Sequence, residues 1–231
     1  MKRKLTVLSG AGMSAESGIS TFRDADGLWN SYRVEEVATP EAFATHPQFV
    51  LDFYNQRRRE LLNVEPNAGH RGLAELEADF EVYIVTQNVD NLHERAGSSR
   101  VIHLHGELMK SCSVRNPDKW YDIPSENPDL HVGDKDSYGD PLRPFIVWFG
   151  EAVPMIEPAI RWVEASDIFV IIGTSLNVYP AAGLLNCVRR GRPVYLIDPK
   201  EVKTYRDDIR VICAGASEGV KQLKARLKSD G

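Results

Sequence analysis

Two histidines, two residues apart, are the first candidates for chemistry in this sequence. His103 and His105 stand in the apolar run at residues 101–105, and on a strand their side chains would face the same side. Imidazole has an unperturbed pKa near ~6.5, which suits a general base at neutral pH. A histidine on a strand can also serve only the protein core, so its position alone does not establish catalysis.

A glycine-rich turn is the second candidate, and its chemistry would be phosphate binding. The apolar run at residues 5–8 leads into GAGMSA at residues 10–15, which has the spacing G-x-G-x-x-A. The glycines would let the backbone approach a pyrophosphate, Ala15 would let the next helix pack close to the strand, and the helix N-terminus would face the phosphates. A glycine turn without a ligand is the alternative. Glu35 and Glu36 come too late for the usual ribose-binding acid, which weighs against a dehydrogenase.

Tyr54 and Arg57 form the third candidate, a clamp for a carboxylate. They lie three residues apart in a helical stretch, so they share one face of the helix. The arginine would offer a bidentate fork and the tyrosine one further hydrogen-bond donor. The alternative is a solvated basic face at residues 57–59, with Tyr54 in the core.

These candidates must be positioned by a framework in which short β-type runs alternate with helical stretches. Gly173, Thr174 and Ser175 directly follow one such run, and open α/β sheets bind ligands at that place. The alternation implies an α/β fold, a Rossmann-like parallel sheet with helices on both faces. The predicted strands are residues 5–8, 82–86, 101–105, 145–148, 168–172, 194–197 and 210–212. The predicted helices are residues 67–79 with Asn67 as the cap, 88–96, 180–190 and 216–228.

Two segments interrupt this alternation. Residues 21–39 show no clear period and contain several aromatic side chains, so we expect a long loop there. Residues 109–143 contain four prolines and few aliphatic side chains. A loop of that length is usually functional or forms a small lobe of its own.

Composition limits the classes of function. The 231 residues carry a net charge of −5, which disfavours nonspecific binding to nucleic acid. No stretch reaches the roughly 18 apolar residues of a membrane span. Three cysteines without a C-x-x-C pair suit a reducing compartment, and the first apolar run is too short for a signal peptide. We expect a cytoplasmic protein with no nucleic-acid or membrane partner, and a monomer because no heptad pattern is present.

Five sequence blocks in a fixed order resemble the sirtuins, the NAD-dependent protein-lysine deacylases. The blocks are GAGMSAESGISTFR at residues 10–23, TQNVD at 86–90, HLHG at 103–106, VWFGE at 147–151 and GTS at 173–175. The likeness covers almost the whole chain except about residues 109–140. It implies a single catalytic domain over residues 1–231, with NAD bound between two parts. The large Rossmann-like part would be about residues 1–20, 70–108 and 144–231, and the small lobe about residues 21–69 and 109–143.

The resemblance also implies a reaction. In sirtuins the acyl oxygen of the lysine attacks C1′ of the nicotinamide ribose, nicotinamide leaves, and a base deprotonates a ribose hydroxyl that attacks the imidate. The products are free lysine, nicotinamide and O-acyl-ADP-ribose. The position before Gly106 matches the family's base, so the resemblance assigns this role to His105.

Binding residues follow from the same resemblance. Asn88 and Asp90 match residues that hold the nicotinamide and its ribose and so join His105 at the reaction centre, although either could instead cap the next helix. Phe22 matches a shield for the intermediate and Arg23 a phosphate contact; in isolation they would be a core aromatic and a loop charge. The residues expected to bind NAD are Gly10, Ala11, Gly12, Ser14, Ala15, Phe22, Arg23, Gln87, Asn88, Asp90, Gly173, Thr174, Ser175, Asp198 and Ala216. The residues expected to bind the acyl-lysine are Tyr54, Arg57, Val147, Phe149, Gly150 and Glu151, the last four by β-augmentation.

The Tyr54–Arg57 pair resembles class III sirtuins, which accept malonyl, succinyl or glutaryl lysine. A small residue beside the acyl tunnel is also typical of that class, and Ala15 fits this pattern. Bacterial members with this pair also resemble deacetylases, so we expect both activities.

Two features depart from the family. Its small domain usually binds a structural zinc through two C-x-x-C pairs, but here only Cys112 is present, with Ser113, Asp118 and Lys119 where thiols are expected. We predict no zinc, and a lobe held by packing of Trp120, Tyr121, Leu130 and Tyr138. Leu196 or Ile197 replaces an Asn that holds the adenosine ribose, and Asp198 could take over that contact.

The leading hypothesis is an NAD-dependent protein-lysine deacylase that favours acidic acyl groups. An alternative enzyme would transfer ADP-ribose to a protein or hydrolyse NAD. The alternative from another class is a module that binds NAD or ADP-ribose without turnover. A base at His105 would be superfluous in such a sensor.

Overall fold

A six-stranded parallel sheet forms the larger part of the molecule. The computed structural model describes residues 2–20 and 32–229. The strand order is β3-β2-β1-β7-β8-β9, which runs outward from β1 in both directions, as in dinucleotide-binding folds. The strands are β1 (Lys4–Ser9), β2 (Glu81–Thr86), β3 (Val101–His103), β7 (Ile168–Ile172), β8 (Val194–Ile197) and β9 (Ile209–Ile212). All seven strand runs predicted from the sequence lie in or overlap an observed strand.

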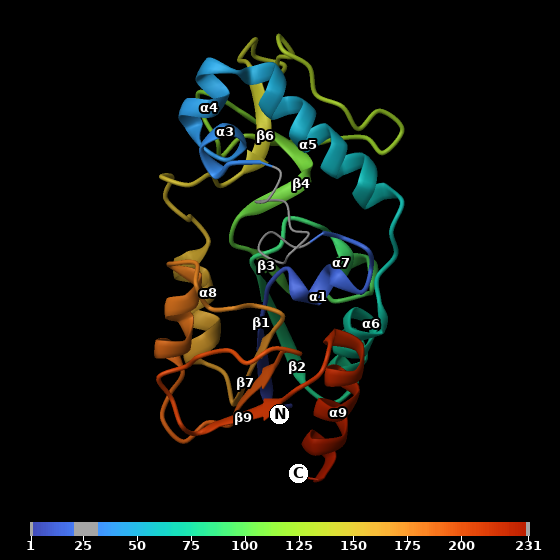
Figure 1. The fold of residues 1–231 in the computed structure, drawn as a ribbon, viewed down its shortest axis with the longest axis vertical. Helices are drawn as coiled ribbons and strands as arrows, with labels where there is room; N and C mark the ends of the chain where they lie inside the picture. The colour runs from blue at the N-terminus through green and yellow to red at the C-terminus, as the bar shows by residue number, and fades with distance from the viewer. Residues whose placement is uncertain (1, 21–31, 230–231) are drawn as a thin grey trace.

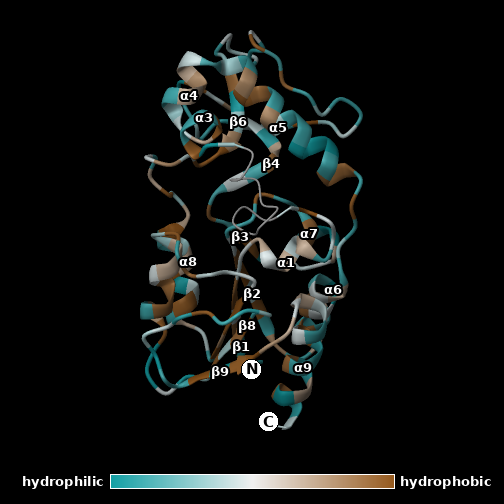
Figure 2. Ribbon diagram, in the orientation of Figure 1, coloured by the Kyte–Doolittle hydropathy of each residue, from teal (hydrophilic) through white to brown (hydrophobic). Residues whose placement is uncertain are grey.

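Helices cover both faces of this sheet (Figure 1). On one face lie α6 (Ala68–Glu75), its 3₁₀ continuation η1 (Leu76–Ala78) and α9 (Ala216–Ser229); on the other lie α8 (Ile156–Glu164) and the 3₁₀ helix η2 (Ala181–Cys187). Successive strand residues alternate between the two cores: Ile197 packs with α9 and Leu196 with the opposite cluster. Because both faces are covered, all five residues of β7 are buried, and the strands appear brown in Figure 2.

A second, antiparallel sheet lies at the upper end of Figure 1. Its order is β5-β4-β6, from β4 (Gly106–Ser113), β5 (Trp120–Asp122) and β6 (Leu142–Ile146). The helices α3 (Val34–Val37), α4 (Pro40–Thr45) and α5 (Pro47–Leu62) pack beside it around Val50, Phe53 and Trp148. Assigning the strand near residues 145–148 to the parallel sheet was therefore wrong. The residue boundaries proposed for the two parts of the domain remain a prediction.

Two short helices are smaller than the sequence suggests. The helix predicted at residues 88–96 is reduced to α7 (Leu92–Arg95), because Asp90 Oδ1 accepts the amide of Leu92 and bends the chain before it (3.1 Å). The helix after the glycine turn, α1 (Gly12–Ala15), is a single turn. The cap at Asn67 is confirmed, since its Oδ1 accepts the amides of Gly69 and His70.

The loops of the small lobe are fastened to α5 by two buried polar side chains. Arg58, fully buried, donates to the carbonyl oxygens of Pro128 and Leu108. Asn55 donates to the carbonyl of Leu130 at 2.9 Å and accepts its amide at 3.0 Å. These bonds satisfy backbone groups of Leu108, Pro128 and Leu130 that would otherwise lack these partners.

Packing explains only part of the lobe. Leu130 is buried with Leu51 and Ile123. Trp120 and Tyr138 lie at the surface, 47% and 73% exposed, so they contribute less burial to the lobe than the predicted packing requires. A lysine side chain lies against the Tyr138 ring: Lys119 Nζ is 4.0 Å from the ring centre, within the range of a cation–π contact.

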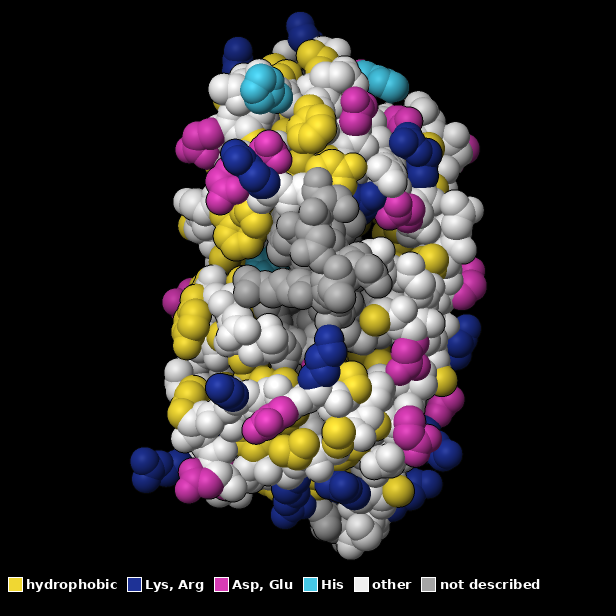
Figure 3. Space-filling model, viewed as in Figure 1, with side chains coloured by type: hydrophobic (Ala, Val, Ile, Leu, Met, Phe, Trp, Pro, Cys, Tyr) yellow, Lys and Arg dark blue, Asp and Glu magenta, His cyan; other side chains and the backbone are white. Residues whose placement is uncertain are grey.

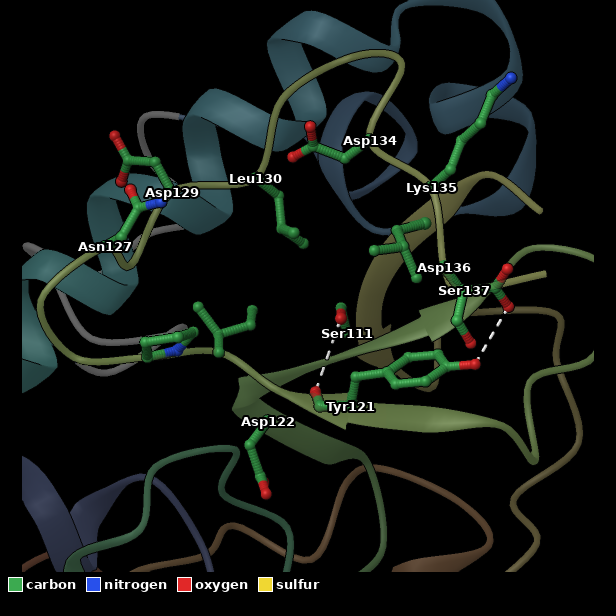
Figure 4. Close-up of a pocket in the computed structure, with 13 residues that line it drawn as sticks. Ser111, Tyr121, Asp122, Asn127, Asp129, Leu130, Asp134, Lys135, Asp136 and Ser137 are labelled. Carbon is green, nitrogen blue, oxygen red and sulfur yellow. Dashed lines mark hydrogen bonds between the residues drawn. The ribbon is translucent and has the colours of Figure 1, made fainter. Parts of the chain in front are cut away.

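The described residues of this lobe do not fit a zinc site. Cys112 is buried on β4 against the carbonyl of Pro144, and burial raises the pKa of its thiol. Within residues 2–20 and 32–229, no three His, Cys, Asp or Glu side chains gather in an arrangement that could hold a metal. A cavity of about 480 Å³ opens in the lobe, where the Tyr121 hydroxyl donates to Asp136 (Figure 4). Its lining includes none of the residues predicted to bind NAD or acyl-lysine.

Basic and acidic side chains of the described residues are interspersed over the face seen in Figure 3. Such a mixture forms no single-sign field on this face. Among the helices of the described residues, none is long and apolar enough to cross a bilayer.

Candidate active site

The glycine turn after β1 and the turn after β7 press directly against each other. Gly10 donates its amide to the carbonyl of Ile172, and Gly12 donates to the carbonyl of Gly173 at 2.9 Å. A Cβ on Gly10 would stand 2.7 Å from the Gly173 oxygen, and one on Gly173 (φ +62°) would stand 2.3 Å from the Met13 nitrogen. The glycines are therefore required by contact between two strand ends, whether or not a phosphate is present.

This packing changes the expected phosphate chemistry. The amides of Met13 and Ser14 donate to the carbonyls of Gly10 and Ala11. These two amides of the first turn of α1 are therefore not available to a phosphate. A helix of four residues also has a small dipole, so the N-terminus of α1 would attract a phosphate only weakly. The phosphate-binding role of the glycine turn stays a prediction. Ala15 is exposed, so it does not pack on the strand as predicted.

A buried polar network joins the first turn of α1 to the loop after β2. Asn88 Nδ2 donates to the carbonyl of Gly10 (3.1 Å) and to Ser14 Oγ (3.0 Å). The Ser14 hydroxyl in turn donates to Asp90 Oδ2 at 2.8 Å. All three side chains are buried, and burial raises the pKa of Asp90 although Ser14 and the Leu92 amide oppose the rise. The network fixes the rotamers of two predicted reaction-centre residues.

His105 is oriented by the same loop. Its Nδ1 lies 2.9 Å from the backbone oxygen of Gln87, and because a carbonyl can only accept, Nδ1 carries the hydrogen. Neutral imidazole then keeps its lone pair on Nε2. Burial lowers the pKa of His105 below 6.5, against the opposing effect of the Gln87 carbonyl. At neutral pH the ring is therefore a free base with Nε2 as the proton acceptor.

The polar side chains after β7 and β8 line the same sheet edge. Thr174 Oγ1 accepts from Gln87 Nε2 at 2.9 Å and from the amide of Leu176 at 3.3 Å, which leaves its own hydrogen to donate. Ser175 is exposed beside it. Asp198 is the first residue beyond β8, and its Oδ1 accepts the amide of Lys200 at 2.8 Å.

The departure at residues 196–197 has a structural reason. Leu196 and Ile197 are each buried in one of the two cores, so neither side chain can reach a ligand at the sheet edge. Ala216 begins α9 and is buried. Glu16 accepts the amide of Ser217 with both carboxylate oxygens (3.2 and 3.3 Å), which joins the end of α1 to the start of α9. Ala216 is therefore held beside the glycine turn.

The segment predicted to hold the acyl-lysine directly follows β6 and is bonded to His105. The Val147 amide donates to the carbonyl of His105 at 2.9 Å, and the Phe149 amide donates to the carbonyl of Ala38 at 3.0 Å. The Phe149 side chain is 46% exposed, and Gly150 adopts φ +92° in the turn that follows. The Glu151 carboxylate is used within this turn.

Glu151 closes the turn rather than offering a free charge. Its Oε2 accepts the amide of Trp148 at 2.8 Å, and its Oε1 lies 2.8 Å from Arg143 Nη1. Both carboxylate oxygens of Glu151 therefore have partners inside the protein, and these partners fix the side chain without any substrate.

Tyr54 and Arg57 both lie on α5, but their predicted geometry needs correction. Tyr54 is buried, and its hydroxyl accepts from Trp148 Nε1 at 3.0 Å; burial raises its pKa, so it stays a phenol with a hydrogen to donate. Arg57 gives Nε and Nη2 to Glu60, at 2.9 and 3.1 Å. Its Nη1 is buried and has no hydrogen-bond partner among the described residues. Arg57 therefore retains one inward donor instead of the expected bidentate fork.

Sequence analysis missed Trp148 and Glu60 as partners of this pair. The spacing of three residues between Arg57 and Glu60 on one helix face was the available signal for Glu60. Nothing local could have revealed Trp148, which comes from 94 residues away. Phe22 and Arg23 lie outside the described residues.

Comparisons with known proteins agree with this arrangement. A relative from Bacteroides thetaiotaomicron named NAD-dependent protein deacylase is 62% identical over 97% of this chain and 98% of its own length. A Helicobacter pylori protein of the same name is 50% identical over 97% of both chains. Among solved structures, the crystal structure of a Sir2 homolog–NAD complex superposes with a TM-score of 0.88 and 40% identity, over 99% of this chain and 91% of that one.

A more distant structure, a Sir2–p53 peptide–NAD⁺ complex, has a TM-score of 0.80 and 29% identity over 98% of this chain and 94% of that one. The sequence model of the Sir2 family matches residues 10–180, which run from the glycine turn past His105 to the start of η2. With relatives matching over nearly their whole length as well, the chain belongs to the Sir2 family.

Proposed function

We propose that this protein removes acyl groups from lysine side chains of proteins, with NAD as co-substrate. The observation that carries the proposal is His105, a neutral base whose Nδ1 is fixed by Gln87 and whose carbonyl accepts the amide of Val147, at the start of the predicted peptide-binding segment. Its full-length relatives named NAD-dependent protein deacylase and the Sir2 homolog–NAD complex support the same reaction class.

The sheet edge offers what a dinucleotide needs. It lies where the strand order reverses beside β1, and Thr174 retains a hydroxyl hydrogen there. When bound, NAD would supply the ribose that takes up the acyl group and would release nicotinamide. Asn88 and Asp90 would hold the nicotinamide side, and Gln87, Thr174, Ser175 and Asp198 the sugars.

Within this site each residue has one task. His105 Nε2 would take the proton of a ribose hydroxyl, because Nδ1 is already protonated. The carbonyl oxygens of Val147 and Phe149, whose amides are already bonded within the protein, would accept amides of the substrate backbone and bring the acyl-lysine beside His105. Asn88 and Asp90 need no rearrangement, because Ser14 holds both before any ligand arrives.

The proposed acyl preference includes acidic groups such as succinyl and malonyl, in addition to acetyl. Arg57 Nη1 and the Tyr54 hydroxyl are two buried donors on one helix, and a carboxylate would satisfy both. A buried guanidinium nitrogen without a partner is costly, so an occupant that accepts its hydrogen bond would be favoured. Acetyl has no second oxygen for this contact.

Arg57→Met tests this preference. The expected result is a loss of about 10- to 100-fold in kcat/KM for a succinyl-lysine peptide, with acetyl-lysine nearly unchanged. Arg59→Met is the matched control, since Arg59 sits on the same helix but pairs with Asp129 at the surface. Equal losses of kcat/KM for both peptides in Arg57→Met would contradict the proposed contact between Arg57 and the acyl carboxylate, and would leave only the proposal of a general deacylase.

We further propose that the enzyme is a cytoplasmic monomer that works without zinc. The small lobe would be held by Arg58, Asn55 and the lysine–aromatic contacts described above. A chelator should leave the melting temperature unchanged, and elemental analysis should find no stoichiometric zinc. A melting temperature that falls on chelation would contradict the zinc-free lobe.

A further inference from the structure

His103 is enclosed by two acceptors, although the residue two positions later was assigned the base. Its side chain is 7% exposed at the end of β3. Nδ1 lies 3.0 Å from the backbone oxygen of Asn88, and Nε2 lies 2.8 Å from Glu94 Oε1 on α7. Neither oxygen can donate. Neutral imidazole has a single N–H and would leave one nitrogen lone pair facing an oxygen, so only the imidazolium satisfies both contacts.

The two histidines hold consecutive carbonyls of one segment. His105 Nδ1 binds the oxygen of Gln87, and His103 Nδ1 binds that of Asn88. The register of β2 and β3 ends at Thr86 and His103, so this segment lies beyond the strand ladder. Backbone bonds hold the ends of this segment, from the Gln87 amide to the carbonyl of Ser9 and from the Leu108 amide to the carbonyl of Val89. The two histidines add side-chain bonds at the two carbonyls between those ends.

We propose that His103, held by Glu94, is a positioning residue that acts as an imidazolium: it fixes the Asn88 carbonyl and so keeps the Asn88 amide and the Asp90 carboxylate in place for the nicotinamide side of the reaction. The Gln87 carbonyl that orients His105 belongs to the same peptide segment. The catalytic part of this inference rests on the proposed function, whereas the protonation state does not.

The charged groups around His103 stabilise the protonated form of its ring. Glu94 and His93 act on it from α7, Glu107 from β4 and Asp90 from the preceding loop, while Lys110 on β4 pairs with Glu107 and acts on Glu94. Burial lowers the pKa of His103, but the bond and charge of Glu94, followed by Glu107 and the Asn88 carbonyl, outweigh it and raise the pKa above 6.5. Burial still raises the pKa of Asp90, and the positive ring of His103 opposes part of that rise.

The sign of the pH effect follows. Below the raised pKa, His103 makes both bonds; as pH rises through it, one proton is lost. The carboxylate of Glu94 competes for the remaining hydrogen, so the Asn88 carbonyl loses its donor. His105 acts in the opposite sense, since it gains activity as it deprotonates below 6.5. Activity should therefore have an acid limb from His105 and an alkaline limb from His103.

Glu94→Gln is the sharpest variant, because it keeps an oxygen acceptor for Nε2 and removes only the charge. Glu75→Gln is the matched control: Glu75 pairs with Lys224 between α6 and α9, away from the site. Two readouts apply to the full-length protein. ¹⁵N NMR of the histidine rings follows protonation without substrate, and kcat against pH follows deacylation and nicotinamide release.

The expected NMR result is a His103 ring doubly protonated at pH 7, with its titration lowered by about one unit or more in Glu94→Gln and unchanged in Glu75→Gln. The alkaline limb of kcat should move by the same amount, with kcat near wild type at low pH. His103→Gln should abolish this limb and lower kcat, while melting in both variants reports folding separately.

Two results would overturn the inference. A His103 ring that is neutral at pH 7 would contradict the proposed imidazolium, independently of any measurement of activity. A Glu94→Gln variant that lowers kcat equally at all pH values assigns the pair a structural role only. Absence of deacylation in the wild type, with the NMR titration as expected, would instead contradict the proposed function.

Discussion

At the residue scale, Glu60 controls how much of Arg57 is available to a substrate. The carboxylate binds Nε and Nη2, and this bond with the charge of Arg57 keeps the pKa of Glu60 low despite partial burial. A succinyl carboxylate would compete with it for the same guanidinium. Glu60 thus limits the clamp to one arginine donor.

Glu60→Gln should therefore improve catalysis with acidic acyl groups. Removal of the competing charge leaves the guanidinium more positive toward the pocket, and we expect KM for a succinyl-lysine peptide to fall by about 3- to 10-fold. KM for acetyl-lysine should not change. Steady-state kinetics on both peptides measure the effect, and an unchanged or higher succinyl KM would show that Arg57 does not bind the acyl carboxylate.

The family resemblance identified most of the candidate site, since residue types alone left His105 as a possible core histidine and Asn88 and Asp90 as possible helix caps. His105, Asn88 and Asp90 do gather at one sheet edge, because each follows a strand of the parallel sheet. The three-residue spacing of Arg57 and Glu60 was a signal for their ion pair, but the sequence could not show that Glu151 is occupied by Arg143. Competition among charged neighbours depends on three-dimensional distances, which spacing along a chain does not specify.

At the element scale, the contact between the turns after β1 and β7 is a tight steric constraint on the site. Gly173 combines a positive φ with a missing Cβ that would meet the backbone of Met13 at 2.3 Å. Gly191 also has a positive φ (+80°), but a Cβ there would meet nothing within 4 Å. Substitution of Gly191 would therefore test backbone strain alone, whereas substitution of Gly173 would test strain together with a steric clash.

Gly191→Ala should cost about 1–2 kcal/mol of unfolding free energy, from strain alone. Gly173→Ala should cost at least about twice that, because the turns must separate, and it should weaken ADP-ribose binding. Urea denaturation and calorimetric titration measure the two effects. Similar losses in both variants would mean that the β1 and β7 turns yield easily and do not define the site.

Elements with uninterrupted apolar runs were predictable from the sequence. The bounds of β7 and β8 match the predicted residues 168–172 and 194–197, because a strand buried on both faces is apolar throughout. β4 was missed since Glu107, Lys110 and Ser111 interrupt its apolar residues. The helix after Asn88 was overestimated because the side chains of Asn88 and Asp90 bond within the site instead of continuing a helix.

At the scale of the whole molecule, two buried histidines connect the site to acid stability. His70 on α6 and His93 on α7 are in edge-to-face contact, 4.8 Å between ring centres, and His93 Nε2 lies 3.0 Å from Ser9 Oγ. Burial lowers the pKa of His70 to about 4 and that of His93 well below 6.5. Both rings are neutral in the folded protein.

Stability should therefore fall in acid. The unfolded chain binds protons on these histidines near pH 6.5, whereas folded His70 does so only near pH 4. The stabilisation is complete above about pH 6.5 and is lost as pH falls toward 4, by on the order of 3 kcal/mol for His70. Urea unfolding between pH 4 and 8 measures this slope.

His70→Gln isolates the histidine contribution. The His70 Nδ1 accepts the Asn67 amide in a capping box, and a glutamine at that position can accept the same bond without titrating. The variant should lose part of the slope between pH 6.5 and 4. His131→Gln, on the surface of the small lobe, is the control and should keep the wild-type slope. An unchanged slope in His70→Gln would contradict the buried neutral ring.

The most direct measurement is mass spectrometry of succinyl-lysine and acetyl-lysine peptides incubated with the protein, with and without NAD. We predict NAD-dependent loss of both acyl groups with one O-acyl-ADP-ribose per lysine freed, and a fall of about 10²-fold or more in His105→Ala. A peptide that gains ADP-ribose, or peptides that stay acylated while the protein binds ADP-ribose, would contradict the proposed deacylase and favour a transferase or a sensor.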